Sequence, residues 1–128
     1  MLSNARAGAV LPASDLKRAR EFYERKLGLK VKEADEKMGE VWYECGQGTV
    51  LSIYQRPPVK VEHTQVAFQV DDIEAEIKEL RLRGVVFEEY DIPEMGLKTV
   101  NGIATMGNYR AAWFKDTEGN ILNIGQKS

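Results

Sequence analysis

Cysteine and histidine are almost absent from the 128-residue sequence, which holds one of each, Cys45 and His63. With a single cysteine, the chain can form neither an intramolecular disulfide nor an all-cysteine metal site. This composition is typical of proteins from a reducing compartment, and we expect a cytoplasmic protein.

Long apolar runs and dense basic runs are also missing. Residues 1–8 lack the apolar core of a signal peptide, and no stretch approaches the roughly 20 apolar residues of a membrane span. The 18 basic and 20 acidic residues leave a formal net charge of −2, with no local cluster of Lys or Arg. We therefore expect neither a nucleic-acid partner nor a membrane partner.

The residues that are present have the composition of a globular protein, with 43% hydrophobic and 30% charged side chains. A chain of this length is long enough to bury one core and short for two. We predict a single domain over residues 1–128.

The first half of the chain predicts the order β-α-β-β-β. An apolar run over 7–11 stops at Pro12, and an amphipathic helix with Ser14 or Asp15 as its N-cap follows and ends at Gly28. Three strand-like runs separated by glycines come next, at 29–33, 41–45 and 49–55.

The second half repeats this order. A strand is predicted over 65–70, then a helix that begins with Asp71 and Glu74 as a capping pair and ends at Gly84. Extended structure resumes over 85–90. The last two strands, 111–115 and 121–126, enclose a turn in which Gly119 is expected to have a positive φ.

Two local features complete this pattern. Asp15 precedes Gly28 by thirteen positions and Asp72 precedes Gly84 by twelve, which favours a duplicated unit. The segment 91–110 is irregular, with no clear period, and we interpret it as a long loop that could cover a ligand site.

Four groups of residues, in chain order, resemble the motifs of one known family. They are Ser14-Asp15-Leu16 with Phe22-Tyr23, then Leu27-Gly28-Leu29, then Val66-Ala67-Phe68-Gln69-Val70-Asp71-Asp72-Ile73, and finally Trp113-Phe114-Lys115-Asp116 with Gly119-Asn120-Ile121-Leu122. Together they resemble the vicinal oxygen chelate superfamily of glyoxalases, bleomycin resistance proteins and extradiol dioxygenases. The resemblance covers nearly the whole chain, with Thr117 where proline is common.

The resemblance implies an α+β glyoxalase-like fold, in which two βαβββ half-repeats, about 7–56 and 64–126, form curved mixed sheets around a cleft. Metalloenzymes of the family usually place four metal ligands in that cleft, on strands one, four, five and eight. On this chain the four positions fall on Gly8, Ser52, Gln65 and Asn123, and none is His, Glu or Cys.

Glycine has no donor atom, and neutral amides and hydroxyls are poor substitutes for imidazole, thiolate or carboxylate at a divalent metal. We therefore predict no native catalytic metal and no cofactor, with a divalent metal as the alternative. His63 lies two residues before Gln65, but one imidazole cannot make a site, and we interpret it as a polar residue entering a strand.

Strand alternation extends the cleft from these positions, because residues i and i+2 share a face. Gln69 then joins Gln65, and Tyr54 joins Ser52, on the cleft face. The opposite, core face takes the apolar partners Leu51, Ile53, Val66, Phe68, Val70, Leu122 and Ile124.

These expectations define a predicted ligand-binding set with a neutral, mixed lining: Ser52, Tyr54, Gln65, Gln69, Trp113 and Asn123. Trp42 and Tyr43 are further candidates for stacking on a ligand or for the core. The competing interpretation is that the polar members lie on a solvated sheet face or at a subunit contact.

No catalytic residue is assigned. Cys45 has no neighbouring histidine or basic cluster to stabilise a thiolate, and we interpret it as an inert buried residue. A general base could come from Glu40, Glu44, Glu88 or Glu89, but only if burial raised its pKa.

Three functions remain open. A neutral cleft without metal ligands favours a small-molecule binding protein that sequesters a drug or a metabolite. The resemblance alone motivates the second, a glyoxalase-type lyase, isomerase or dioxygenase with a rearranged or metal-independent centre, so whether the chain is an enzyme stays open. The third is a non-catalytic interaction module. The resemblance also implies a homodimer.

Overall fold

The computed structural model describes residues 1–128, which form two compact units. Unit 1 consists of Met1–Lys60 with Thr117–Asn120, and unit 2 consists of Val61–Asp116 with Ile121–Ser128. The turn at Thr117–Asn120 interrupts the last hairpin of unit 2, yet its contacts place it in unit 1. The expected single domain over 1–128, with half-repeats at 7–56 and 64–126, stays a prediction.

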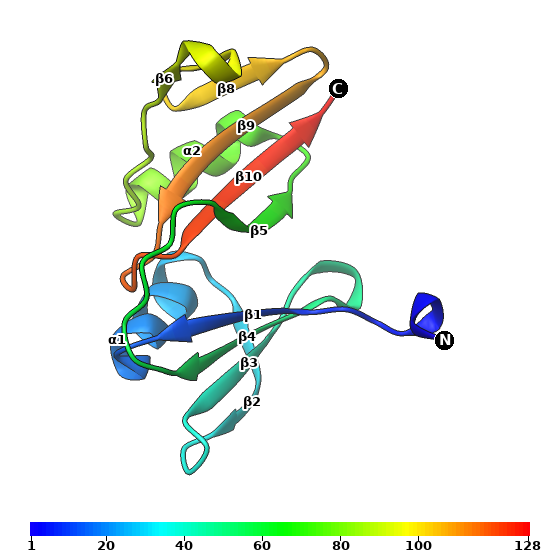
Figure 1. Ribbon diagram of the computed structural model, residues 1–128, viewed down its shortest axis with the longest axis vertical. Coiled ribbons are helices and arrows are strands. Elements are labelled where there is room, and N and C mark those ends of the chain that lie inside the picture. Colours follow the sequence, from blue (N-terminus) through cyan, green and yellow to red (C-terminus); the bar gives the residue numbers. More distant parts are fainter. The chain divides into compact units, whose positions relative to one another are not determined.

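Unit 1 is a four-stranded mixed sheet with one helical segment (Figure 1). In chain order its main elements are β1 (Ala9–Ala13), α1 (Leu16–Glu21), the π-helical η2 (Phe22–Lys26), β2 (Lys30–Asp35), β3 (Glu40–Glu44) and β4 (Val50–Gln55). The strand order is β1-β4-β3-β2, and β1 pairs with β4 in parallel while the other pairs are antiparallel.

The N-cap of α1 is Asp15, one of the two residues that the sequence predicts for this role. The Asp15 carboxylate accepts a hydrogen bond from the backbone N–H of Arg18 at 3.1 Å and so satisfies one of the free donors of the first turn. Alternate residues of the strands then pack under the helix. The resulting core consists of Leu11, Ala13, Ala19, Phe22, Tyr23, Val41, Tyr43, Leu51 and Ile53.

The first strand does not stop at Pro12, which corrects the sequence prediction. β1 continues to Ala13, and Pro12 is the partner of Tyr54 in the parallel ladder. Proline has no backbone N–H to donate to a neighbouring strand. β1 is an edge strand with a neighbour on one side only, so it can tolerate a proline.

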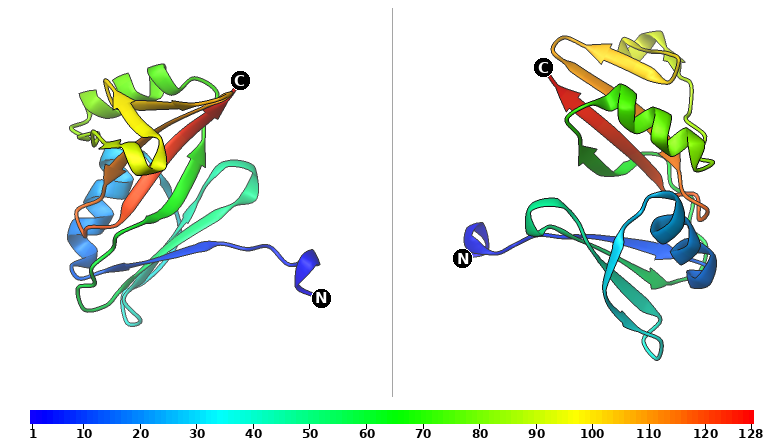
Figure 2. Two further views of the ribbon diagram at one scale, coloured as in Figure 1. Left: turned by 45° about the horizontal axis from the view of Figure 1, so that its top comes forward. Right: turned by 180° about the vertical axis from the view of Figure 1, so that it is seen from behind.

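Unit 2 is a six-stranded mixed sheet covered on one face by a longer helix, α2 (Figures 1 and 2). Its elements are β5 (Thr64–Gln69), α2 (Ile73–Leu82), β6 (Asp91–Ile92), β7 (Leu97–Val100), β8 (Ile103–Met106), β9 (Tyr109–Lys115) and β10 (Ile121–Lys127). The strand order is β5-β10-β9-β8-β7-β6, and β5 pairs with β10 in parallel. The predicted α+β class, built from two βαβββ-type units with mixed sheets, is confirmed.

The core of unit 2 follows the predicted apolar positions. Ile73, Ile77 and Leu80 on one side of α2 are 0%, 3% and 7% exposed. They pack with residues of the sheet and of the segment after the helix, namely Val85, Phe87, Phe114, Leu122 and Ile124. Phe87 and Phe114 also form a bridge between backbones and an edge-to-face ring contact at 5.5 Å.

The N-cap of α2 is Asp72 rather than Asp71, which corrects the predicted capping pair. The Asp72 carboxylate accepts from the Ala75 N–H at 3.1 Å, so the cap bonds three residues ahead, as Asp15 does in α1. Glu74 instead forms an ion pair with Arg110 at 2.9 Å. The duplicated spacing between helix start and glycine stop, which pairs Asp72 with Asp15, predicts this cap.

The segment 91–110 is more regular than the sequence predicts. It contains β6, β7 and β8, joined by tight turns, and β8 pairs with β9. The expectation of a long loop was therefore wrong. Strands of two to four residues are too short to show a clear alternation of apolar and polar positions, and this is why they escape detection.

The helices of both units are short. α1 has six residues and α2 has ten, and no helix is long and apolar enough to cross a membrane. The three glycines expected at helix ends and in the last turn, Gly28, Gly84 and Gly119, have φ values of 71°, 91° and 85°.

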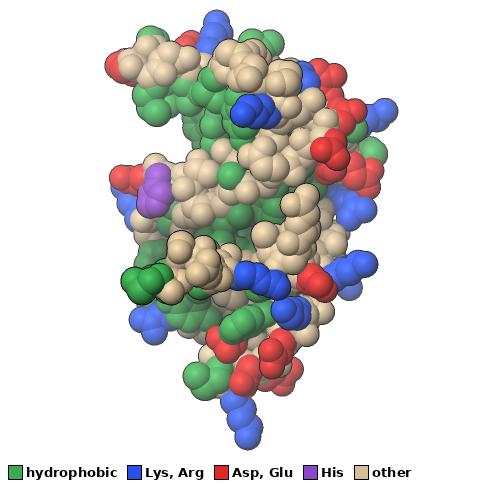
Figure 3. Space-filling model, turned by 90° about the vertical axis from the view of Figure 1, so that its right-hand side faces the viewer, with side chains coloured by type: hydrophobic (Ala, Val, Ile, Leu, Met, Phe, Trp, Pro, Cys, Tyr) green, Lys and Arg blue, Asp and Glu red, His purple; other side chains and the backbone are tan.

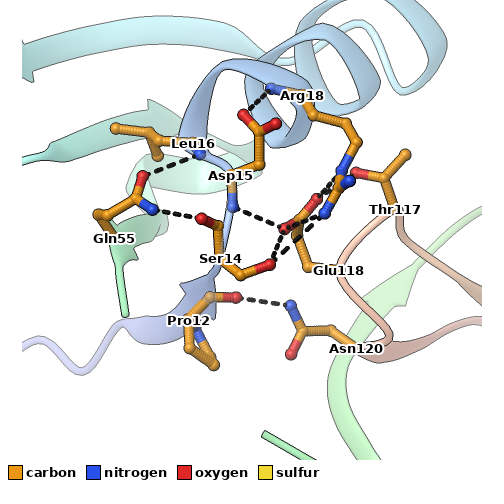
Figure 4. Close-up of polar contacts among 9 residues, drawn as sticks. All are labelled: Pro12, Ser14, Asp15, Leu16, Arg18, Gln55, Thr117, Glu118 and Asn120. Atoms are coloured by element: carbon orange, nitrogen blue, oxygen red, sulfur yellow. Dashed lines mark hydrogen bonds and ion pairs between the residues drawn. The ribbon is translucent and has the colours of Figure 1, made fainter. Parts of the chain in front are cut away.

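The Glu118 carboxylate holds the Thr117–Asn120 turn against the start of α1 (Figure 4). It accepts hydrogen bonds from the Asp15 N–H at 3.0 Å and the Ser14 hydroxyl at 3.1 Å, and it forms an ion pair with Arg18 at 2.8 Å. Its side chain is 2% exposed. Asn120, in the same turn, donates to the Pro12 carbonyl at 3.0 Å.

This network controls the charge of Glu118. Burial raises the pKa of the carboxyl, but hydrogen bonds from Arg18, the Asp15 N–H, Thr117 and Ser14 outweigh burial and lower the pKa to about 2. A carboxyl whose pKa is lower in the folded state stabilises the fold above its unfolded pKa. That stabilisation is lost as the pH falls through the folded value.

We predict that Glu118→Gln lowers the free energy of unfolding at pH 7 by on the order of 2 kcal/mol, because a neutral amide loses the charge-assisted bonds. Denaturant unfolding at pH 7 and at pH 3 measures the effect, and the deficit should shrink at pH 3. Glu21→Gln, on the exposed side of α1, is the matched control and should change little. An equal deficit at both pH values would contradict the role of the ionised carboxylate.

Candidate functional site

One face of the unit 1 sheet has no helix over it, and alternation determines which side chains it presents. On β4, Leu51 and Ile53 are 2% and 0% exposed and face the helix, whereas Ser52 and Tyr54 point to the other side. Ser52 lies between Val10 of β1 and Trp42 of β3 in the ladder. We call this surface the open face of unit 1.

The open face holds a cavity of about 570 Å³. Its apolar wall is formed by Val10, Val50 and the rings of Trp42 and Tyr54. The polar groups around it belong to Arg6, Lys32, Glu40 and Ser52. A concave, mainly apolar lining with a few polar groups is the usual form of a small-molecule site.

Most of the polar groups in this cavity are not engaged within the protein. The Trp42 indole N–H and the hydroxyls of Ser52 and Tyr54 make no hydrogen bond to another residue, and Lys32 and Glu40 form no ion pair. Arg6 donates one hydrogen bond, from Nη1 to the Gly48 carbonyl at 3.0 Å. The cavity therefore offers donors and acceptors that a ligand can use.

The two aromatic neighbours Trp42 and Tyr43 have different roles. Trp42 is 40% exposed and lines the cavity, whereas Tyr43 is fully buried and stacks on Tyr23 with ring centroids 6.0 Å apart. Tyr43 therefore belongs to the core, and Trp42 remains a candidate for ligand contact.

The other four predicted ligand-binding residues lie in unit 2. On β10, Asn123 is the ladder partner of Trp113 on β9 and of Ala67 on β5. Alternation puts Gln65 and Gln69 on the same face as Ala67, away from the buried Leu122 and Ile124. The face of each strand is thus as predicted, and the binding role of these residues stays a prediction.

Polar contacts already occupy part of this unit 2 face. The Gln65 side-chain oxygen accepts from the Ile121 N–H at 3.2 Å, and Trp113 donates from Nε1 to the Thr64 hydroxyl at 3.0 Å. The buried Oδ1 of Asn123 has no hydrogen-bond partner. Of the four, Asn123 therefore has the clearest unused acceptor.

Gln69 is held by a tyrosine that crosses the sheet. Its Nε2 donates to the Tyr109 hydroxyl at 3.2 Å. A Cβ atom at Gly125, the ladder partner of Gln69, would lie only 1.9 Å from that hydroxyl oxygen. Gly125 is therefore required for the close approach of Tyr109.

The remaining titratable candidates do not form a catalytic group. His63 is exposed, and burial raises the pKa of the half-buried Cys45 thiol, which disfavours a thiolate. Hydrogen bonds from Thr99 and from the Gly102 N–H lower the pKa of Glu89, the opposite of what a buried general base needs. Charged side chains of both signs are intermixed over the surface in Figure 3.

Sequence reasoning did not place Arg6, Val10 or Lys32 in a ligand site, and it named Glu40 only as a possible general base. Alternation from Gly8 would have found Val10. Lys32 could not be found in this way, because β2 has an irregularity between Val31 and Glu33 that shifts its pairing with β3.

Comparison with known proteins identifies the family. The model of the Glyoxalase/Bleomycin resistance protein/Dioxygenase superfamily matches residues 7–124. The chain belongs to this superfamily. No curated protein sequence matches it.

Solved structures share the fold of this superfamily member at low sequence identity. FosX, a fosfomycin resistance protein from Listeria monocytogenes, is 14% identical with a TM-score of 0.73, over 98% of this chain and 93% of FosX. TnmS3, an antibiotic binding protein from Streptomyces sp. CB03234, is 21% identical with a TM-score of 0.68, over 98% of each chain. A glyoxalase family protein from Bacillus anthracis is 18% identical with a TM-score of 0.70, over the full length of both chains.

The residues of this superfamily member do not fit the four-ligand metal centre that the resemblance implies. Gly8 contributes no side chain, Ser52 contributes a neutral hydroxyl, and the Gln65 oxygen already accepts a backbone hydrogen bond. No three His, Cys, Asp or Glu side chains are grouped closely enough to hold a metal ion.

We predict that protein purified without a polyhistidine tag or a chelator carries far less than one metal ion per chain. Elemental analysis measures the content, and a thermal-shift series with Zn, Ni, Mn and Fe tests added metal, with no rise in Tm expected. Stoichiometric metal with a clear rise in Tm would contradict the prediction and favour an enzyme.

Proposed function

We propose that this protein is a metal-free small-molecule binding protein that sequesters a drug or a metabolite. The ligand binds in the cavity on the open face of unit 1. The observation that carries this proposal is a mainly apolar cavity whose indole N–H and hydroxyl groups have no partner within the protein.

The cavity supports binding better than catalysis. Nucleophilic catalysis needs a nucleophile hydrogen-bonded to a base, and the Ser52 hydroxyl makes no such bond. Glu40 is the one carboxylate in the lining, and its ladder partner Asp35 is not among the lining residues. The antibiotic-binding protein TnmS3 shares the fold, which is consistent with a binding role, although the likeness extends to the fold alone.

Trp42 provides the test of this function. Indole N–H resonances in a ¹H–¹⁵N NMR spectrum report separately on Trp42 and Trp113, the two tryptophans of the chain. In a screen of small aromatic and polar compounds, we predict that ligands shift the Trp42 resonance and that Trp42→Ala weakens binding at least tenfold.

Trp113→Phe is the matched control and should retain binding in the unit 1 cavity. A screen in which no compound shifts Trp42 would count against the proposed function. Shifts confined to Trp113 would move the site to unit 2 and contradict the unit 1 assignment.

We also propose that the protein is a homodimer in which a second copy covers the open face and closes the unit 1 cavity. Val10 is 61% exposed, and with Trp42 and Tyr54, at 40% and 38%, it leaves an apolar surface in water. Relatives resembling this chain complete their clefts across such an interface, which supports a second copy as the occupant.

Sedimentation equilibrium is expected to give twice the 14.5 kDa mass of one chain. Val10→Asp, which places a charge on the open face, should shift the equilibrium toward the monomer. Val59→Asp, at an exposed position outside the open face, is the control and should stay dimeric. A monomer at all concentrations would rule the dimer out.

A further inference from the structure

Hydrogen-bond donors outnumber acceptors around the unit 1 cavity. Arg6, Lys32 and the Trp42 indole can only donate, while the hydroxyls of Ser52 and Tyr54 can do either. Glu40 is the one side chain that can only accept. A ligand that satisfies this cavity must therefore be rich in acceptor atoms.

The lining of the cavity has two basic side chains and one acidic one, in a protein that carries a formal net charge of −2. Arg6 and Lys32 are basic, Glu40 is acidic, and neither Lys32 nor Glu40 is neutralised by an ion pair. Arg6 uses one of the five N–H donors of its guanidinium on the Gly48 carbonyl, which holds it in place and leaves the others for a ligand.

The sheet register separates the basic end of the cavity from the acidic one. Arg6 contacts Gly48, next to the Val50 end of β4, whereas Glu40 is the ladder partner of Tyr54 at the opposite end. Val50 and Tyr54 are four residues apart, which corresponds to about 13 Å along a strand. Glu40 is thus too distant to neutralise Arg6.

The middle of the cavity offers flat apolar surfaces. Trp42 is 40% exposed and lies beside Ser52 in the ladder, and Tyr54 follows on the same face of β4 with 38% exposure. The Arg56 guanidinium lies 5.9 Å from the centroid of the Tyr54 ring and leaves the Trp42 indole uncovered. A flat ring can therefore stack on Trp42 while its substituent reaches the basic end.

We infer that the unit 1 cavity binds an aromatic carboxylate, with the ring on Trp42 and the carboxylate on Arg6. This inference rests on the proposed function, because it names the ligand class of the same cavity. A bidentate guanidinium–carboxylate contact suits Arg6, and charge-assisted hydrogen bonds are the stronger kind. A cationic ligand would be repelled by Arg6 and Lys32 and attracted by Glu40 alone.

Three probes of similar size separate the parts of this inference: naphthalene-2-carboxylate, naphthalene-2-carboxamide and decahydronaphthalene-2-carboxylate. Titrations at pH 7, followed by the Trp42 indole resonance, should show naphthalene-2-carboxylate binding at least tenfold more tightly than either of the others. The amide lacks the charge, and the saturated rings are not flat and cannot stack on Trp42.

Paired variants test the two basic residues. Arg6→Gln with Lys32→Gln should abolish the preference for the carboxylate over the amide. Arg25→Gln with Lys37→Gln changes the net charge equally, at exposed positions outside the cavity, and should keep the preference.

The outcomes distinguish the ligand class from the proposed function. Equal binding of acid and amide at Trp42 would overturn the carboxylate while leaving small-molecule binding intact, and equal binding of both acids would overturn the aromatic ring. If neutral or cationic compounds shift the Trp42 resonance while none of the three probes does, the inferred ligand class is wrong and small-molecule binding still stands. If no compound of any kind shifts Trp42, the proposed function fails with it.

Discussion

Each sheet of this protein has one helical segment, which buries one of the two faces of the sheet. In unit 1 the segment formed by α1 and η2 takes the face that carries Leu51 and Ile53. In unit 2 the longer α2 takes the face that carries Leu122 and Ile124. Because side chains alternate along a strand, burial of these residues determines which neighbours face away. The candidate site is a consequence of that constraint.

The buried Glu118 carboxylate adds a second constraint, because it fixes the turn that contains it against the start of α1. Residues 117–120 are a turn within the β9–β10 hairpin, yet they complete unit 1 at the N-terminus of α1. Asp15 caps its own helix and donates its N–H to Glu118, so the start of α1 is fixed from both sides. A fragment that ended at Lys60 would lack this contact.

The sequence predicted the periodic parts of the structure well. Helix caps and stops, the long strands and the faces of β4, β5 and β10 follow from hydrophobic spacing and glycine positions, which depend on neighbours in the chain. The short strands β6 to β8 were missed because alternation needs more residues than they have. Pro12 misled the prediction because its tolerance depends on β1 being an edge strand, and pairing order is not visible in a single sequence.

The cavity was only partly predictable for the same reason. Ser52 and Tyr54 followed from alternation, but the irregularity in β2 interrupts the period, so Lys32 could not be assigned to a face. Arg6 precedes the first strand altogether, and its position depends on a hydrogen bond to Gly48, a residue distant in the chain. Contacts of this kind arise from tertiary structure and leave no local pattern.

Gly8 is unsuited to a metal ligand in its packing as well as in its chemistry. A Cβ atom at Gly8 would lie 3.0 Å from the Val50 carbonyl oxygen, a backbone atom that cannot rotate away. A histidine or glutamate at this position would supply a donor atom, but it would also require the β1 and β4 backbones to move apart. The close approach of these two strands brings Val10 beside Ser52 and so forms the apolar wall of the cavity. Because a tight Cβ contact of this kind needs a shift of a few tenths of an ångström, the close packing of the wall disfavours a metal ligand at position 8.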